Sequence, residues 1–203
     1  MNQSFNNYTD ANSLDLLMQE IEKTIDNKCF IAALHMALSI PDMLGKLMYP
    51  KLDGKQKYIK WFDDNVHDIT FGYLYSDNPF GKSDGSPDIN GEVCYALRCK
   101  FYHEGTNHVE SKTKARINEF VLVINDKEYV MGDYAGIEFE FDKWDPKTNI
   151  VPFTKYLYVS CKGLVRAIIE AAKAFINSNP NLEYPKLRIN NGGGKINDDW
   201  FVK

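Results

Sequence analysis

Two residues with the chemistry to act on a phosphodiester lie close together near the middle of the chain. Arg98 and His103 are five residues apart, and Gly105 is typical of a residue that ends a helix. A guanidinium can stabilise charge developing on phosphate oxygens, and an imidazole can move a proton near neutral pH. The pair therefore predicts metal-independent chemistry in which a ribose 2′-OH attacks the adjacent phosphate.

The same spacing also fits a purely structural role. Arg98 could pair with acidic residues such as Asp63, Asp64 or Glu92, and His103 could simply complement the carbonyl end of its helix. On a regular α-helix, residues five apart point about 140° away from each other. The two side chains then share a cleft only if the last turn unwinds, and the sequence leaves both interpretations open.

The cysteines give little support for metal or redox chemistry. No CxxC spacing occurs and each thiol falls in an apolar stretch, so we expect buried structural thiols in a reducing compartment. Cys99 has the one setting that favours reactivity, because it follows Arg98 and precedes His103 by one turn. The four thiols are Cys29, Cys94, Cys99 and Cys161.

The remaining candidates are weaker. His35 lies in an apolar segment and is expected in or near the core, whereas His67 and His108 are expected in solvent. Aromatic residues at helical spacing could stack on a nucleobase, although such residues more often form core. They are Tyr58, Trp61 and Phe62, with Lys60 beside them. The alternating Glu138 and Glu140 fit a solvated sheet face, so neither a metal nor a cofactor is expected.

Composition and charge place the chain among ordinary globular proteins. Of its 203 residues, 44% are hydrophobic and 26% charged. The net charge of −4 argues against a general nucleic-acid coat protein, but a local cationic site can still bind RNA. The longest apolar run, Cys29–Leu38, covers about half a bilayer, and the N-terminus does not resemble a signal peptide. We therefore expect a cytoplasmic protein.

Apolar periodicity predicts helices that position the Arg98 segment. Ser13 is expected to cap a helix from Leu14, and residues 29–38 are expected to form a helix buried on all sides. Pro41 either kinks that helix or begins a new one, for which Ser39 is a plausible cap. Further helices are expected at residues 43–48, 55–66, 89–104 (capped by Asp88) and 153–178, with residues 1–12 flexible and residues 70–88 in a loop.

A small antiparallel β insertion is expected at about residues 115–145. Ile117–Ile124 and Glu128–Met131 flank a turn at residues 125–127 as in a hairpin, and residues 137–141 alternate as in a half-buried strand. The Gly-rich tail at residues 191–194 is expected to join two short strands. The predicted fold class is mainly α (α+β), with one domain over residues 13–203.

The segment Arg98-Cys-Lys-Phe-Tyr-His103, followed by Glu104-Gly105 at a helix end, resembles the signature of the HEPN superfamily. That superfamily comprises helical domains, many of them metal-independent endoribonucleases of toxin–antitoxin, abortive-infection and other defence systems. The resemblance covers roughly residues 13–104 and 153–178. It implies an HEPN-like helical bundle with Arg98 and His103 as the catalytic pair and with Tyr102 and Glu104 beside the substrate.

The resemblance also implies partners. In active members two protomers usually pair so that their motifs converge on one cleft, which implies a homodimer that binds RNA, with an antitoxin or regulatory protein as a further partner. Cys99 departs from the family pattern, in which a polar residue, often Asn, commonly follows the Arg. The alternative is a non-catalytic HEPN-like module that binds a nucleotide or a protein.

Overall fold

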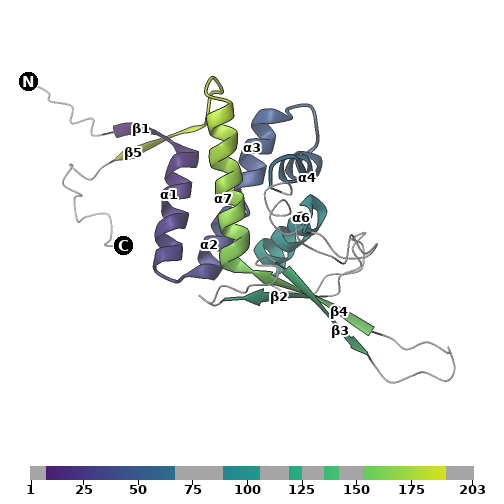
Figure 1. Ribbon diagram of the computed structural model, residues 1–203. Helices are drawn as coiled ribbons and strands as arrows, with labels where there is room; N and C mark the ends of the chain where they lie inside the picture. The colour runs from purple at the N-terminus through teal and green to yellow at the C-terminus, as the bar shows by residue number, and fades with distance from the viewer. Residues whose placement is uncertain (1–7, 67–88, 106–118, 125–134, 142–152, 191–203) are drawn as a thin grey trace, which may run out of the picture.

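The computed structural model describes residues 8–66, 89–105, 119–124, 135–141 and 153–190 (Figure 1). The helices are α1 (Ser13–Asp26), α2 (Phe30–Ala37), α3 (Ile40–Met48), α4 (Gly54–Asn65), α6 (Gly91–Cys99), η1 (Lys100–Glu104) and α7 (Cys161–Ser178). The strands are β1 (Tyr8–Asn12), β2 (Glu119–Val123), β3 (Ala135–Phe141), β4 (Phe153–Ser160) and β5 (Lys186–Asn190). The mainly helical architecture expected from the apolar periodicity is confirmed.

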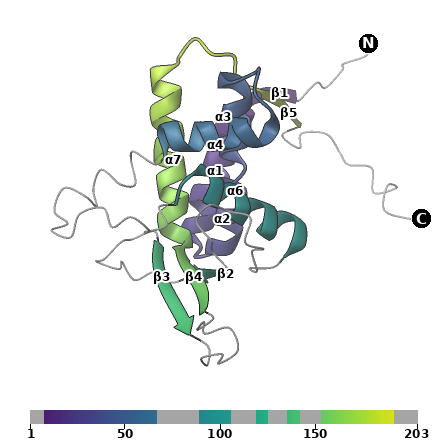
Figure 2. The ribbon, with the colours of Figure 1, turned by 90° about the vertical axis from the view of Figure 1, so that its right-hand side faces the viewer.

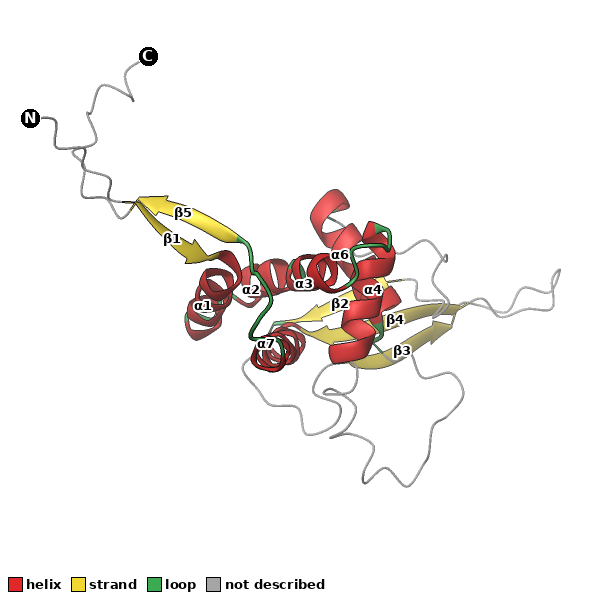
Figure 3. Ribbon diagram, turned by 90° about the horizontal axis from the view of Figure 1, so that it is seen from above, coloured by secondary structure: helices red, strands yellow, loops and turns green. Residues whose placement is uncertain are grey.

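Helix α7 forms the centre of the hydrophobic core. Seen from above, α1, α2, α3 and α4 curve around it (Figure 3). Its buried side is nearly continuous, and Phe175 meets Trp61 of α4 edge to face with ring centroids 6.1 Å apart. The buried residues of α7 are Cys161, Leu164, Val165, Ala167, Ile168, Ile169, Ala171, Ala172 and Phe175. A helix buried over this much of its surface fixes the positions of the shorter helices.

Helix α1 is capped one residue earlier than expected. The Oδ1 atom of Asn12 accepts a hydrogen bond from the Leu14 N–H at 3.0 Å, which is the role expected of Ser13. The Ser13 hydroxyl instead donates to the carbonyl of Pro185 at 2.9 Å. Asparagine and serine are both good N-cap residues, so it is the contact of Ser13 with Pro185 that leaves Asn12 to cap the helix.

The apolar stretch after Cys29 folds as two helices. Pro41 lies in the first turn of α3 and so begins a new helix. Ser39 is at the N-cap position, but its hydroxyl donates backwards to the carbonyl of Met36 at 2.7 Å. Helix α2 is not buried on all sides as expected, because the side chain of Ile31 is 47% exposed.

Helices α2 and α3 together satisfy a simple test for a membrane span. By length and composition, the stretch Phe30–Met48 is long and apolar enough to cross a membrane. It is longer than the apolar run expected from the sequence, which covered about half a bilayer. Half of that stretch is buried within the fold, as in the core helices of globular proteins, which pass the same test. This part of the chain is therefore weak evidence for a membrane span.

Helices α4 and α6 lie in very close contact. A Cβ atom at Gly91 would lie 2.5 Å from the carbonyl oxygen of Ile59, so glycine is required there. The Gly91 N–H also donates to Oδ1 of Asp63 at 2.5 Å. Asn90 caps α6 by accepting an N–H of its first turn at 3.0 Å. The helix therefore begins later than expected, and the expected cap, Asp88, is outside the described residues.

Strand β4 is the middle strand of a small sheet with the order β2-β4-β3. Strand β3 pairs with β4 antiparallel, whereas β2 pairs with β4 parallel, with Phe120 opposite Leu157. The described partner of β2 is thus not a following hairpin strand, and the expected turn at residues 125–127 is outside the described residues. Figure 2 shows β3 and β4 extending beyond the helices.

Residues 153–160 form β4 rather than the first turns of the last helix, so that expectation is wrong. Buried and half-buried side chains alternate along the strand with a period of two. The alternating residues are Tyr156, Leu157, Tyr158 and Val159. Ser160 then caps α7, its hydroxyl accepting the Gly163 N–H at 3.1 Å. Aromatic and β-branched residues favour the strand, and so short a run fits both periods.

Residues 8–12, which were expected to be flexible, form β1. This strand pairs antiparallel with β5, with Ala11 opposite Leu187, and the two-stranded ribbon extends from the side of the bundle (Figure 3). Nε of Arg188 lies 3.3 Å from Oδ1 of Asp10, a residue 178 positions earlier in the chain. The expected Gly-rich turn at residues 191–194 is outside the described residues.

Candidate functional site

The Arg98 segment is one helix with two geometries. It is α-helical as α6 and continues without a break as the π-helix η1. Gly105 ends it in the left-handed conformation, with φ 60° and ψ 25°. A residue with a Cβ atom is strained at this φ, so the glycine is well suited to end the helix. The helix end predicted at Gly105 is confirmed.

The π-turn changes the position of His103 relative to Arg98. A π-helix closes its turns with i→i+5 hydrogen bonds, so residues five apart lie about one turn apart along it. Most residues between Arg98 and His103 belong to η1. The regular α-helical offset therefore does not apply, and the backbone turns position 103 toward the side of the helix that carries Arg98. The side chains of His103 and Glu104 are outside the described part of the chain.

The guanidinium of Arg98 is held by Asp42, a residue in the first turn of α3. Nη2 of Arg98 lies 2.6 Å from Oδ2 of Asp42, and the two side chains are 23% and 33% exposed. Pairing of Arg98 with Asp63, Asp64 or Glu92 was considered from the sequence. Among the described residues the ion-pair partner is Asp42, so Arg98 does pair with a carboxylate, but with none of these three.

Two of the carboxylates considered as partners of Arg98 have other roles. Asp63 accepts the backbone N–H of Gly91 and so attaches α4 to the start of α6. Asp64 lies on the exposed side of α4, where it binds Lys60 at 2.9 Å. Both are therefore occupied by contacts that stabilise α4 and its junction with α6.

Asp42 is the functional candidate that sequence reasoning missed. The available signal was an acidic residue between Pro41, which is buried, and the apolar Met43 at the start of a helix. A half-buried carboxylate requires a partner, because burying an unpaired charge is costly. Nothing local in the sequence, however, indicates which cation that partner is.

Three tyrosine rings surround the guanidinium of Arg98. Its Cζ atom lies 5.8 Å from the ring centroids of Tyr58 and Tyr95 and 5.6 Å from that of Tyr102. Cation–π contacts of this kind are stronger where the cation is partly removed from water. The Nε atom is buried without a hydrogen-bond partner among the described residues. Arg98 is thus fixed in orientation and retains unused donor capacity.

Burial and charge act in opposite directions on the ion pair. On Asp42, burial raises the pKa more than Arg98 lowers it, so the pKa is raised. On Arg98, burial is the largest effect and lowers the pKa, but the contributions of Asp42, Tyr58 and Cys99 together raise it by more, so the guanidinium stays charged. Both pKa values are raised, which opposes the charge on Asp42 and favours the charge on Arg98. The 2.6 Å contact is the stronger evidence that the pair forms.

Tyr102 lies where a substrate could meet both Arg98 and helix α2. Its side chain is 37% exposed, and its hydroxyl donates a hydrogen bond to the carbonyl oxygen of His35. The rings of Tyr102 and His35 are tilted against each other with centroids 3.7 Å apart. His35 is exposed, so the expectation that it lies in or near the core is wrong. The structure therefore brings Tyr102 to Arg98, which lies four residues earlier in the chain.

The other sequence candidates do not form a site. Tyr58, Trp61 and Phe62 are fully buried, so none can stack on a base from solvent. Cys94 and Cys161 are buried as expected, whereas Cys29 is exposed and Cys99 is half-buried, which corrects the expectation for these two thiols. His67 and His108 are outside the described residues.

A metal centre is not apparent in the described part of the chain. No group of three or more His, Cys, Asp or Glu residues there is placed to hold a metal ion. The chemistry available at the described site therefore rests on Arg98, Asp42 and the surrounding tyrosines, at a helix end that carries His103.

Comparisons with protein-family models, with curated proteins and with solved structures returned no match.

Proposed function

We propose that this protein is a metal-independent endoribonuclease of the HEPN type, with Arg98 and His103 as its catalytic pair. The observation that carries the proposal is the π-turn at the end of α6, because it rotates position 103 toward the side of Arg98. π-turns inside α-helices are often found at functional sites. The resemblance of residues 98–105 to the HEPN signature supplies the reaction type.

The proposed reaction is transesterification at one phosphodiester of RNA. The 2′-oxygen attacks the adjacent phosphorus and the bond to the 5′-oxygen breaks, which leaves a 2′,3′-cyclic phosphate and a 5′-hydroxyl. His103 moves the proton that leaves the 2′-OH, and the 5′-oxygen gains one. Arg98 donates hydrogen bonds to the non-bridging oxygens as their charge increases.

Asp42 acts in this scheme as a positioning residue for Arg98. Its contact fixes one end of the guanidinium, while the tyrosine rings hold its plane. A catalytic cation is most effective when its orientation exists before the substrate arrives. The Arg98 side chain is 23% exposed, which leaves part of it accessible to a phosphate.

The reaction needs both a base and an acid, and one copy of the motif supplies one histidine. A homodimer in which the motifs of two protomers converge provides a second His103 for the other proton transfer. The proposal therefore includes a homodimer, a cytoplasmic location, and an antitoxin or regulatory protein that restrains the activity. Tyr102 and Glu104 are proposed to contact the substrate beside the catalytic pair.

The test is incubation of the purified protein with a mixture of tRNA and mRNA in EDTA. The wild-type protein is expected to cleave RNA to products with 2′,3′-cyclic phosphate ends. His103→Ala and Arg98→Ala are expected to leave the RNA intact, provided that both remain folded by circular dichroism. Equal cleavage by all three proteins would contradict the assignment of the pair.

A second candidate is a non-catalytic module that binds a nucleotide or a protein. The ion pair between Arg98 and Asp42 favours it, because a guanidinium already paired has less capacity for a phosphate. Intact RNA after incubation with a folded wild-type protein would select this candidate. Binding of that RNA measured by fluorescence anisotropy would then distinguish a nucleic-acid module from one that binds protein.

A further inference from the structure

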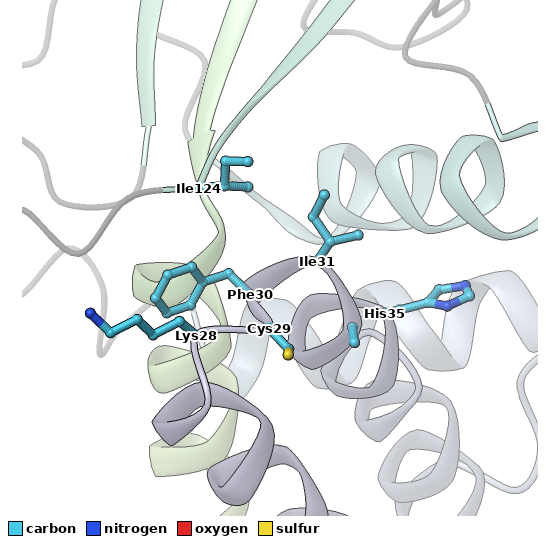
Figure 4. Close-up of a pocket in the computed structure, with 7 residues that line it drawn as sticks. Lys28, Cys29, Phe30, Ile31, His35 and Ile124 are labelled. Atoms are coloured by element: carbon cyan, nitrogen blue, oxygen red, sulfur yellow. The ribbon is translucent and has the colours of Figure 1, made fainter.

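A hollow of about 540 Å³ lies between the start of α2 and the end of β2 (Figure 4). Its volume is in the range of pockets that bind small molecules. The lining is mostly apolar, with a lysine and a histidine among its residues. The lining residues are Lys28, Cys29, Phe30, Ile31, Ala32, His35 and Ile124.

Two large apolar side chains of this hollow are exposed. Ile31 is 47% and Ile124 is 56% exposed, although they come from elements far apart in the sequence. Figure 4 shows Ile31 projecting from the start of α2 toward the sheet end that carries Ile124, and Phe30 beside Lys28. Isoleucine side chains exposed to water lack the free energy that burial of their apolar surface would contribute. A flat apolar ligand that covers them would supply this free energy.

The hollow and the Arg98 site are linked through His35 and Tyr102. His35 lines it and contacts Tyr102, with ring centroids 3.7 Å apart. Tyr102 in turn lies over the guanidinium of Arg98 at 5.6 Å. Two aromatic side chains, His35 and Tyr102, therefore separate the hollow from the guanidinium of Arg98.

A cationic side chain lies beyond each end of the hollow, and that of Arg98 is the one paired with Asp42. Lys28 precedes α2 at one end, and Arg98 lies past His35 at the other. An apolar hollow between two cations complements a nucleobase with a phosphate on either side. The concave shape fits a base better than it fits the broad face of another protein, because protein interfaces are larger and flatter.

We propose that this hollow binds a nucleobase of the RNA strand whose scissile phosphate lies at Arg98. Ile31 and Ile124 contact the base, and Lys28 attracts the phosphate on its far side. Base contacts of this kind tolerate many sequences, because every base presents apolar faces. The proposal rests on the proposed function, since it names the part of the RNA that lies next to the catalytic pair.

Cys29 provides a direct probe of the hollow. It is exposed and lines the hollow, so a bound base should shield it from a maleimide. The probe is a short mixed-sequence RNA with 2′-O-methyl groups, which block cleavage and leave binding intact. Alkylation of each thiol is followed by peptide mass spectrometry on the full chain in EDTA. We expect this RNA to slow alkylation of Cys29 at least tenfold.

Two variants separate the hollow from the rest of the surface. Ile31→Asp places a charge in the hollow and is expected to raise the RNA concentration for half-protection of Cys29 about tenfold. Leu187→Asp is the matched control, because Leu187 is 53% exposed on β5, away from the hollow. It is expected to leave the protection unchanged.

Several results would overturn the proposal. They are alkylation of Cys29 unaffected by RNA, equal protection in Ile31→Asp, and protection that grows with protein concentration in the absence of RNA. The last would mean that a second copy covers the hollow. Cleavage of unmodified RNA, measured on the same samples, reports the proposed function separately: protection without cleavage keeps the base site and removes the nuclease.

Discussion

The ion pair between Arg98 and Asp42 gives a stability prediction that can be worked from the structure. Breaking a fully buried pair by removing one partner costs about 3–5 kcal/mol, whereas an exposed pair contributes about 0–1 kcal/mol. The side chains of this pair are 23% and 33% exposed, so it lies between these limits. We expect a coupling free energy of about 2 kcal/mol between the two side chains.

A double-mutant cycle with Asp42→Asn and Arg98→Met measures this coupling in the free energy of unfolding. Asp42→Asn alone is expected to lower the free energy of unfolding by less than this coupling free energy, because burial raises the pKa of Asp42 and so opposes its ionised form. By linkage, this carboxyl favours folding below its unfolded pKa of 3.8 and loses that advantage as the pH rises through its raised folded value. The cycle should therefore be run at pH 7, well above the ordinary carboxyl pKa of 3.8.

Urea unfolding followed by tryptophan fluorescence is a suitable assay, since Trp61 is buried in the core. The matched control is the pair of Lys173 and Glu22, which lie 2.5 Å apart with side chains 52% and 47% exposed. Its coupling is expected to be below about 1 kcal/mol. A coupling for Arg98 and Asp42 no larger than that of the control would refute the claim that Asp42 fixes the guanidinium.

Further predictions concern packing and thiol chemistry. Gly91→Ala is expected to lower the free energy of unfolding by about 1–3 kcal/mol, because the added Cβ meets the α4 backbone. Gly54→Ala is the control and should not destabilise the protein, because nothing lies within 4 Å of its added Cβ. Equal urea midpoints for the two variants would contradict this prediction. At pH 8 a maleimide should modify Cys29 and spare Cys94 and Cys161, because burial raises their pKa to about 12 and about 11. The raised pKa values of these two thiols favour folding below pH 9, and this contribution to stability is lost as the pH rises toward 11–12. The melting temperature should therefore fall above pH 9. A melting temperature that stays constant up to pH 11 would contradict this prediction.

The parts of the fold that are encoded locally could be predicted from the sequence. Helix α4 was expected within one residue at each end, and Gly105 was identified as a helix end. Each depends on side-chain periodicity or on the conformational freedom of glycine. Arg98 and Tyr102 are four residues apart, a spacing that places side chains on one side of a helix, and they are in contact at 5.6 Å.

The features that sequence reasoning missed depend on contacts between distant segments. Strand β1 exists because β5 pairs with it. Asp42 binds a guanidinium 56 positions later in the chain, which is the difference between the residue numbers of the pair. The π-turn in η1 adds a further change, since no residue pattern distinguished it from a regular α-helix. Candidate residues were therefore accessible from sequence, but their geometry was not.

We propose that the site at the end of α6 and η1 cleaves RNA by attack of a 2′-hydroxyl. It is tested most directly with one RNA prepared in two forms, unmodified and fully 2′-O-methylated, incubated with the wild-type protein in EDTA. We predict cleavage of the unmodified form alone, with 2′,3′-cyclic phosphate and 5′-hydroxyl ends, and loss of that cleavage in His103→Ala. Equal cleavage of both forms, or an intact unmodified RNA with a folded protein, would contradict the account.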